Sequence, residues 1–253
     1  MVDVHSHILP GIDDGAKTLE ESVEMLRLAA ENGTSDIVAS PHSNHQFKFD
    51  PEIIAEKVEE LRQASGGIVR IHTGCDFHLS FDNIQDSLQH PSKYAINHKN
   101  YVLVEFSDLL IPKTTDEVFY QMQSVGMIPI ITHPERNMLL QRRLENLETW
   151  CESGCLLQVT AQSFSGRFGK HAKAFADLLL QKGLVHIVAS DAHDTQHRPP
   201  SLKEAYEYVA KEYGVARAEL LFVKNPGATL TGAAVEMELE ELAPVKKWYQ
   251  FWG

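Results

Sequence analysis

The residues of this chain that could do chemistry are histidines and carboxylates, each at or just past the end of a predicted strand. They are His5, His7, Asp14, His42, Asp76, Glu105, His133, Asp191 and His193. Alternate residues of a strand point to the same side, so the two imidazoles of the H-x-H pair can face one point. A donor set of imidazoles and carboxylates without thiolates favours Zn, Mn or Fe. It exceeds what one ion needs, and therefore predicts a site of two or three ions with bridging carboxylates.

Two arginines follow these donors closely. Arg136 lies three residues after His133, and Arg198 lies seven after Asp191. Taken singly, either one could form a surface salt bridge. Beside a metal cluster they are expected at the rim of the same site, where guanidinium groups bind phosphate oxygens in pairs. Metal ions provide a nucleophilic water near neutral pH and clamp a phosphoryl group. The residues thus predict hydrolysis of a phosphate ester, with both arginines in the catalytic machinery.

Strands that can position these residues alternate with helices along the whole chain. Runs such as Ile128–Ile131 are apolar throughout, as expected of parallel strands covered on both sides. The rhythm repeats seven times and predicts an α/β fold, either a parallel barrel or a doubly wound sheet. No glycine-rich loop follows the first strand, which counts against a dinucleotide-binding fold. In a parallel barrel all strand ends open on one face, where active sites lie.

The predicted helices begin at recognisable caps, such as the T-x-x-E boxes at Thr18 and Thr114 and the Asp50-Pro51 pair. We expect an irregular insertion over residues 77–99 and one domain over residues 1–253. The aromatic tail Trp248–Trp252 is expected to dock on its own domain or to form an oligomer contact. The expected helices cover residues 18–32, 50–61, 114–125, 138–153, 170–182, 201–213 and 216–222.

The composition narrows the classes of partner. The formal net charge of −12, from 35 acidic and 23 basic residues, argues against a nucleic-acid partner. No apolar run approaches the roughly 18 residues of a membrane span. No signal peptide is recognisable, so we expect a cytoplasmic protein without membrane insertion. None of the three cysteines is followed six residues later by arginine, which excludes the nucleophile loop of cysteine-dependent phosphatases.

Several short motifs together resemble a known superfamily. They are V-D-V-H-S-H-I-L-P-G-I-D-D-G at 2–15, Pro41-His42, V-E-F-S at 104–107, T-H-P-E-R at 132–136 and A-S-D-A-H at 189–193. The chain resembles the PHP (polymerase and histidinol phosphatase) superfamily. With R-P-P at 198–200 and N-P at 225–226, it is similar to the bacterial manganese-dependent protein-tyrosine phosphatases of capsule and exopolysaccharide loci. The resemblance extends over essentially the whole chain.

This resemblance implies a distorted (β/α)7 barrel with three divalent ions, manganese first and zinc or iron as alternatives. It implies that Arg136 and Arg198 hold the phosphate. We expect a metal-bridging hydroxide to attack phosphorus directly. The implied substrate is phosphotyrosine in the tail of a bacterial tyrosine autokinase that controls polysaccharide export. The implied ligands are His5, His7 and Asp191 for the first ion, Glu105 and His133 for the second, and Asp14, His42 and His193 for the third.

One position departs from the family pattern. The residue that bridges the first two ions is usually glutamate, but here Asp76 is one methylene shorter. It could bridge at a tighter spacing or bind one ion only. His78 could compensate, or be an exposed loop histidine. His45 and His197 have no assigned role, and Asp13 is expected to support a turn or a ligand.

Two rival functions stay open at this point. One is hydrolysis of histidinol phosphate or another small phosphomonoester within the same superfamily. The other is a non-catalytic metal-binding regulator, in which altered ligands serve partner binding. A nuclease role is disfavoured by the acidic balance. The oligomeric state is open, and a homo-oligomer is possible.

Overall fold

The computed structural model describes residues 1–237, whose strands form two parallel sheets. The first sheet has the order β1-β2-β4, with β1 at Val2–Ser6, β2 at Asp36–Ala39 and β4 at Arg70–Thr73. The second has the order β3-β5-β6-β7-β8-β9. Its strands are β3 (His42–Ser43), β5 (Asp76–His78), β6 (Tyr101–Glu105), β7 (Ile128–Thr132), β8 (Leu156–Thr160) and β9 (Ile187–Ala189). The predicted α/β class with parallel strands is confirmed.

The two sheets remain hydrogen-bonded to each other at both boundaries. On one side, β2 leads into β3 and β4 leads into β5 after short breaks, across which Gly74 N donates to Ala39 O and Asp76 N to Pro41 O. A Cβ atom on Gly74 would lie 2.6 Å from Val38 Cγ1, so only glycine fits this break. On the other side, Asp191 N donates to His5 O at 2.9 Å, which joins the end of β9 to β1.

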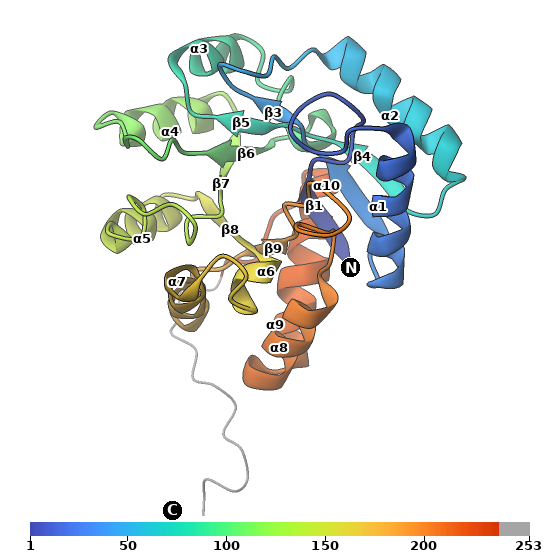
Figure 1. The fold of residues 1–253 in the computed structure, drawn as a ribbon. Helices are drawn as coiled ribbons and strands as arrows, with labels where there is room; N and C mark the ends of the chain where they lie inside the picture. The colour runs from blue at the N-terminus through green and yellow to red at the C-terminus, as the bar shows by residue number, and fades with distance from the viewer. Residues whose placement is uncertain (238–253) are drawn as a thin grey trace, which may run out of the picture.

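Helices surround the strands (Figure 1). Thr18 caps α1 by accepting from Glu21 N, and Asp50 caps α2 by accepting from Glu52 N, as their sequences predict. Six helices are α1 (Leu19–Glu31), α2 (Pro51–Ser65), α4 (Thr115–Ser124), α5 (Leu144–Glu152), α7 (Lys170–Gln181) and α8 (Lys203–Tyr213). The other helical elements are α3 (Phe81–Gln89), η1 (Ile96–His98), α6 (Ala161–Phe164), α9 (Val215–Glu219), η2 (Leu220–Lys224) and α10 (Asn225–Thr231).

Apolar side chains from six strands pack into one buried cluster. Its members include Val4, Val38, Leu103, Ile130, Leu156 and Ile187, from β1, β2, β6, β7, β8 and β9 in turn. A second cluster lies between the second sheet and its helices, and a third lies under α1 and α2. The strands are therefore covered on both sides, as their continuous apolar runs predict.

Three expectations about local structure are wrong. Residues 77–99 are not irregular, since they contain α3 and η1. Ser80 caps α3, because its hydroxyl accepts from Asn83 N. The Asn83 side chain in turn donates to Ser43 O and His78 O. The helix expected over 138–153 begins only at Leu144, because the Asn137 side chain accepts from the backbone N–H groups that follow it and holds a turn.

Asn225-Pro226, which the expected helices precede, opens one further helix, α10. Pro is compatible with a first helical turn, where its missing N–H is not needed. The third wrong expectation is the capping box at Thr114, which stands at the start of α4 but makes no capping hydrogen bond with its side chain. The tail Trp248–Trp252 lies outside the described residues. Over residues 1–237, every helix is too short or too polar to cross a lipid bilayer.

Candidate metal centre

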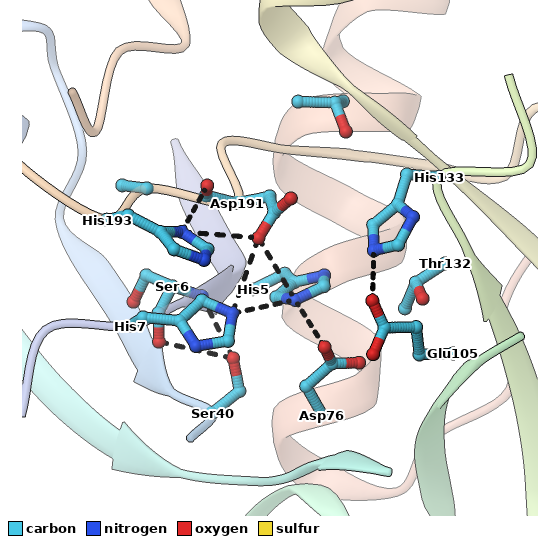
Figure 2. A network of polar contacts seen from close by, with 12 residues as sticks. His5, Ser6, His7, Ser40, Asp76, Glu105, Thr132, His133, Asp191 and His193 are labelled. Carbon is cyan, nitrogen blue, oxygen red and sulfur yellow. Dashed lines mark hydrogen bonds and ion pairs between the residues drawn. The ribbon is translucent and has the colours of Figure 1, made fainter. Parts of the chain in front are cut away.

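The predicted donors lie close together, and they occupy three kinds of position along the chain. Some lie on the strands themselves, some directly after them, and Asp14 lies on the loop that follows β1. Figure 2 shows His5, His7 and His193 around Asp191, with His133 and Glu105 beside them. Donor atoms within 4.8 Å of one another form four overlapping groups. The groups are His7, Asp14, His42 and His193; His5, His7 and Asp76; His5, His133 and Asp191; and His42, Asp76 and Glu105.

Three donors at the centre have the spacing of ligands around one ion. His5 Nε2 and His7 Nε2 lie 3.3 Å apart, and each lies within 3.4 Å of Asp191 Oδ1. An ion bonded at about 2.1 Å to donors at 90–109° separates them by about 3.0–3.4 Å. All three residues are buried. Two imidazole nitrogens and a carboxylate oxygen that converge in this way fit a divalent cation.

The ring nitrogens that face away from this point are held by hydrogen bonds. His5 Nδ1 lies 2.9 Å from Gln158 Oε1, and His7 Nδ1 lies 2.7 Å from Asp13 Oδ2. His193 Nδ1 donates to the backbone oxygen of Asp191 at 3.0 Å. When Nδ1 carries the proton, Nε2 keeps a lone pair for a metal. The supporting role expected of Asp13 agrees with its contact to His7.

A second group borders the first and is more open to solvent. Asp14 Oδ1 lies 3.3 Å from His42 Nε2 and 3.6 Å from His193 Nε2. The Asp14 side chain is half-exposed, with 51% of its surface accessible. The ring centroids of His7 and His193 are 4.0 Å apart, so the second group lies directly beside the first. This group matches the donors expected for a third ion.

The surroundings of Asp76 show most directly whether these residues fit a metal ion. Its Oδ2 lies 3.6 Å from His5 Nε2 and 2.9 Å from His42 Nδ1, without hydrogen-bond geometry to either. The side chain is fully buried, and neither carboxylate oxygen has a hydrogen-bond partner among the described residues. A buried carboxylate left in this state is costly, and a cation between these donors removes that cost. The residues present therefore fit a metal ion.

Glu105 and His133 form the remaining pair, with Glu105 Oε1 3.8 Å from His133 Nε2 (Figure 2). A cavity of 110 Å³ borders the pair and is lined also by Arg136. His78 Nδ1 lies 3.6 Å from Glu105 Oε2, but His78 belongs to none of the four donor groups. His45 and His197 are exposed and also outside these groups.

The charge states of Asp191 and His193 suit metal binding, whereas that of His7 does not. Burial opposes the charge of Asp191, but His5 and Arg136 outweigh it and hold the pKa of the carboxyl well below its usual range. Burial lowers the pKa of His193 to about 3, which leaves it neutral. Against the effect of burial, Asp13 raises the pKa of His7 to about 9. A proton must therefore leave His7 when a metal binds.

Both predicted arginines reach the centre. Arg136 Nη1 and Arg198 Nη2 both donate to Asp191 Oδ2, the oxygen opposite to the one that faces the histidines. Asp191 itself has a φ of 51°, in the left-handed region that non-glycine residues seldom occupy. This turn directly after β9 aims one carboxylate oxygen at the imidazoles and the other at the guanidinium groups. Two guanidinium groups and two imidazoles thus meet on a single carboxylate.

Sequence reasoning missed three buried residues that support the donors. Gln158 holds His5, and its only signal is a polar residue within the apolar strand Leu156–Thr160. Asp3 accepts from the backbone N–H groups of Ser190 and His5, and so ties β1 to the end of β9. Glu135 accepts from Thr160 N and from the Ser163 hydroxyl, which fixes the loop of His133 and Arg136 against α6.

Comparisons with known proteins agree with this architecture. Tyrosine-protein phosphatase YwqE of Bacillus subtilis is 34% identical over 234 residues, which are 91% of this chain and 91% of that protein. Tyrosine-protein phosphatase CpsB of Streptococcus pneumoniae is 31% identical over 235 residues, covering 89% of this chain and 96% of CpsB.

A solved structure is also similar over nearly the whole chain. It belongs to the crystal structures of YwqE from Bacillus subtilis and CpsB from Streptococcus pneumoniae, described as unique metal-dependent tyrosine phosphatases. It superimposes with a TM-score of 0.88 at 32% identity and covers 98% of this chain and 100% of that one. The family model for capsular polysaccharide synthesis, CpsB/CapC, matches residues 1–231. The chain belongs to the CpsB/CapC family.

Proposed function

We propose that this protein is a metal-dependent protein-tyrosine phosphatase that hydrolyses phosphotyrosine on a protein substrate. The observation that carries the proposal is Asp191, which presents one oxygen to two imidazoles and the other to two guanidinium groups. A phosphate ester bound beside the arginines lies next to the metal donors. The relatives YwqE and CpsB are named tyrosine-protein phosphatases, which supports phosphotyrosine over other phosphate esters.

The proposed centre holds three divalent ions, with manganese preferred and zinc or iron as alternatives. The groups around Asp191, around Asp14 and around Glu105 supply one position each, and Asp76 is proposed to join the first to its neighbours. Bound ions would supply Lewis acidity and a water molecule of lowered pKa. The proposed ligands are His5, His7, Asp14, His42, Asp76, Glu105, His133, Asp191 and His193.

The protein groups have separate tasks in the proposed reaction. Arg136 and Arg198 turn from Asp191 Oδ2 toward the phosphate oxygens and stabilise the charge on the phosphoryl group as the ester bond breaks. Gln158 and Asp13 keep the Nδ1 protons of His5 and His7 directed away from the substrate. Tyrosinate is a fairly good leaving group, so the reaction does not depend on a strong general acid.

The wider proposal follows from the same features. A closed, distorted (β/α)7 barrel is supported by the bonds that link the sheets at both boundaries and by the apolar cluster drawn from six strands. We propose one domain over the whole chain and a cytoplasmic location. The proposed substrate is a bacterial tyrosine autokinase that controls capsule or exopolysaccharide synthesis, since the family description names capsular polysaccharide synthesis.

The test compares Asp191→Ala and His5→Ala with the wild-type protein on a phosphotyrosyl peptide and on histidinol phosphate. Each variant should lose hydrolysis of the peptide while circular dichroism shows an intact fold. Wild type should prefer the peptide. Retained activity in both variants would refute the proposed centre, and a preference for histidinol phosphate would refute the substrate. Fewer than two bound ions per chain together with no phosphatase activity would favour a regulator.

A further inference from the structure

An aromatic ring lies directly against one of the two proposed phosphate-binding arginines. The Cζ atom of Arg136 lies 4.4 Å from the ring centroid of Phe168, which places the guanidinium over the ring. Phe168 belongs to the short segment between α6 and α7 and is partly exposed. Neither the metal donors nor the proposed catalytic steps use this side chain.

The backbone of this segment holds the ring in place. Gly166 and Gly169 flank the pair Arg167-Phe168 with φ values of 82° and 91°, a conformation that favours glycine. Gly166 N donates to Ser163 O, and Gly169 N donates to Gly166 O. Phe168 is thus presented on a tight turn and not on a free loop.

The same turn contacts one of the two proposed phosphate-binding arginines and the loop that carries the other. The guanidinium of Arg167 donates to Gln196 O, two residues before Arg198. Phe168 covers Arg136. The ring therefore stands beside the place where a phosphate held by the two arginines would be bound.

The chemistry of an aryl phosphate matches this position. Its ring follows the phosphorus after a single oxygen, so a phosphate hydrogen-bonded to Arg136 at about 2.8 Å brings that ring near Phe168. Aromatic pairs prefer edge-to-face or offset contacts and gain attraction beyond simple burial. An alkyl phosphate of small volume has no surface to place there. Phe168 therefore favours an aromatic ester over an alkyl one.

We propose that Phe168 is a specificity-determining residue, which contacts the aromatic ring of the substrate while Arg136 holds the phosphate. The inference rests on the proposed phosphotyrosine phosphatase function and deepens it by assigning a residue to the recognition of the tyrosine ring. Phe168 takes no part in bond breaking and acts through contact with the substrate.

Inhibition by phosphonates tests this contact without a leaving group. Inhibition constants are measured on the metal-loaded full chain for phenylphosphonate and for methylphosphonate. Phe168→Ala and Phe168→Leu should weaken phenylphosphonate between about two- and tenfold. The same variants should change methylphosphonate by less than about twofold, and Phe168→Tyr should keep wild-type discrimination. Tyr120→Ala, which removes a 74% exposed ring on α4, is the matched control and should change neither constant.

Equal weakening of both inhibitors would overturn the proposal, because Phe168 would then only position Arg136. No change in either inhibitor would overturn it as well. In both cases a wild-type protein that hydrolyses a phosphotyrosyl peptide leaves the proposed function standing. A wild-type protein that neither hydrolyses the peptide nor binds the phosphonates would overturn the function and the Phe168 assignment together.

Discussion

The hydrogen bond from His5 to Gln158 allows a prediction that separates ligand orientation from the ligands themselves. Gln158→Leu keeps the size and the strand position of the side chain but removes the acceptor that lies 2.9 Å from His5 Nδ1. Both residues are fully buried, so water cannot replace the lost acceptor. The His5 proton then has no partner at Nδ1, and the tautomer with the proton on Nε2 becomes favourable. That tautomer cannot bind a metal.

The expected magnitude follows from the position of Gln158 behind the ligand. Loss of such a supporting partner costs about 10–100-fold in metal affinity. A buried donor left without an acceptor also costs about 1–3 kcal/mol, which should lower the free energy of unfolding of the metal-free protein. Activity at saturating manganese should recover to within a few-fold of wild type, because Gln158 touches neither the substrate nor the metal.

The assay is a manganese titration of phosphotyrosyl peptide hydrolysis, with calorimetry to measure binding directly. Gln123→Leu is the matched control, because this glutamine on α4 donates to Ser153 O and contacts none of the donors. It should leave the manganese midpoint unchanged. An unchanged midpoint in Gln158→Leu would refute the role assigned to the His5 tautomer. A loss of activity that saturating metal does not restore would refute it too.

Two further predictions concern the anion site and the acid stability. Arg198→Lys should lower kcat/KM for a phosphotyrosyl peptide at least about tenfold, because an ammonium lacks the rigid planar pair of donors that matches two phosphate oxygens. Reduced kcat/KM with an unchanged melting temperature would support this, and unchanged kinetics would contradict it. His186 is buried, and burial together with Arg217 lowers its pKa from 6.5 to about 4. Between pH 6.5 and 4 the unfolded chain therefore binds a proton at His186 that the folded chain does not bind. The free energy of unfolding falls by about 3 kcal/mol as the pH falls through this range. His186→Asn should flatten the pH dependence of urea unfolding in that window, and an equal slope in both proteins would contradict the assignment.

The sequence predicts the strand ends well because each donor follows an apolar run with a clear boundary. His133 and Asp191 are examples, since each lies within two residues of the end of a buried strand. It also predicts that both arginines approach the site. Their shared contact with Asp191 Oδ2 was not predictable, because it depends on the left-handed turn after β9.

Other features depend on contacts between distant parts of the chain. Nothing near Gln158 in the sequence points to His5, which precedes it by 153 positions. The late start of α5 at Leu144 depends on the Asn137 side chain, which competes with a helix for the backbone N–H groups that follow it. The helix α3 was missed because Asn83 gains its stabilising partners from β3 and β5, outside its own segment.

The central claim is that donors on the ends of parallel strands form a metal centre that hydrolyses phosphotyrosine. Its most direct test strips the full-length protein with a chelator, adds manganese in steps, and follows both bound metal and phosphate release from a phosphotyrosyl peptide. We expect no hydrolysis without metal and activity that rises as the ions bind, toward three per chain. Hydrolysis that is independent of metal, or a fully loaded protein that leaves phosphotyrosine intact, would contradict the account.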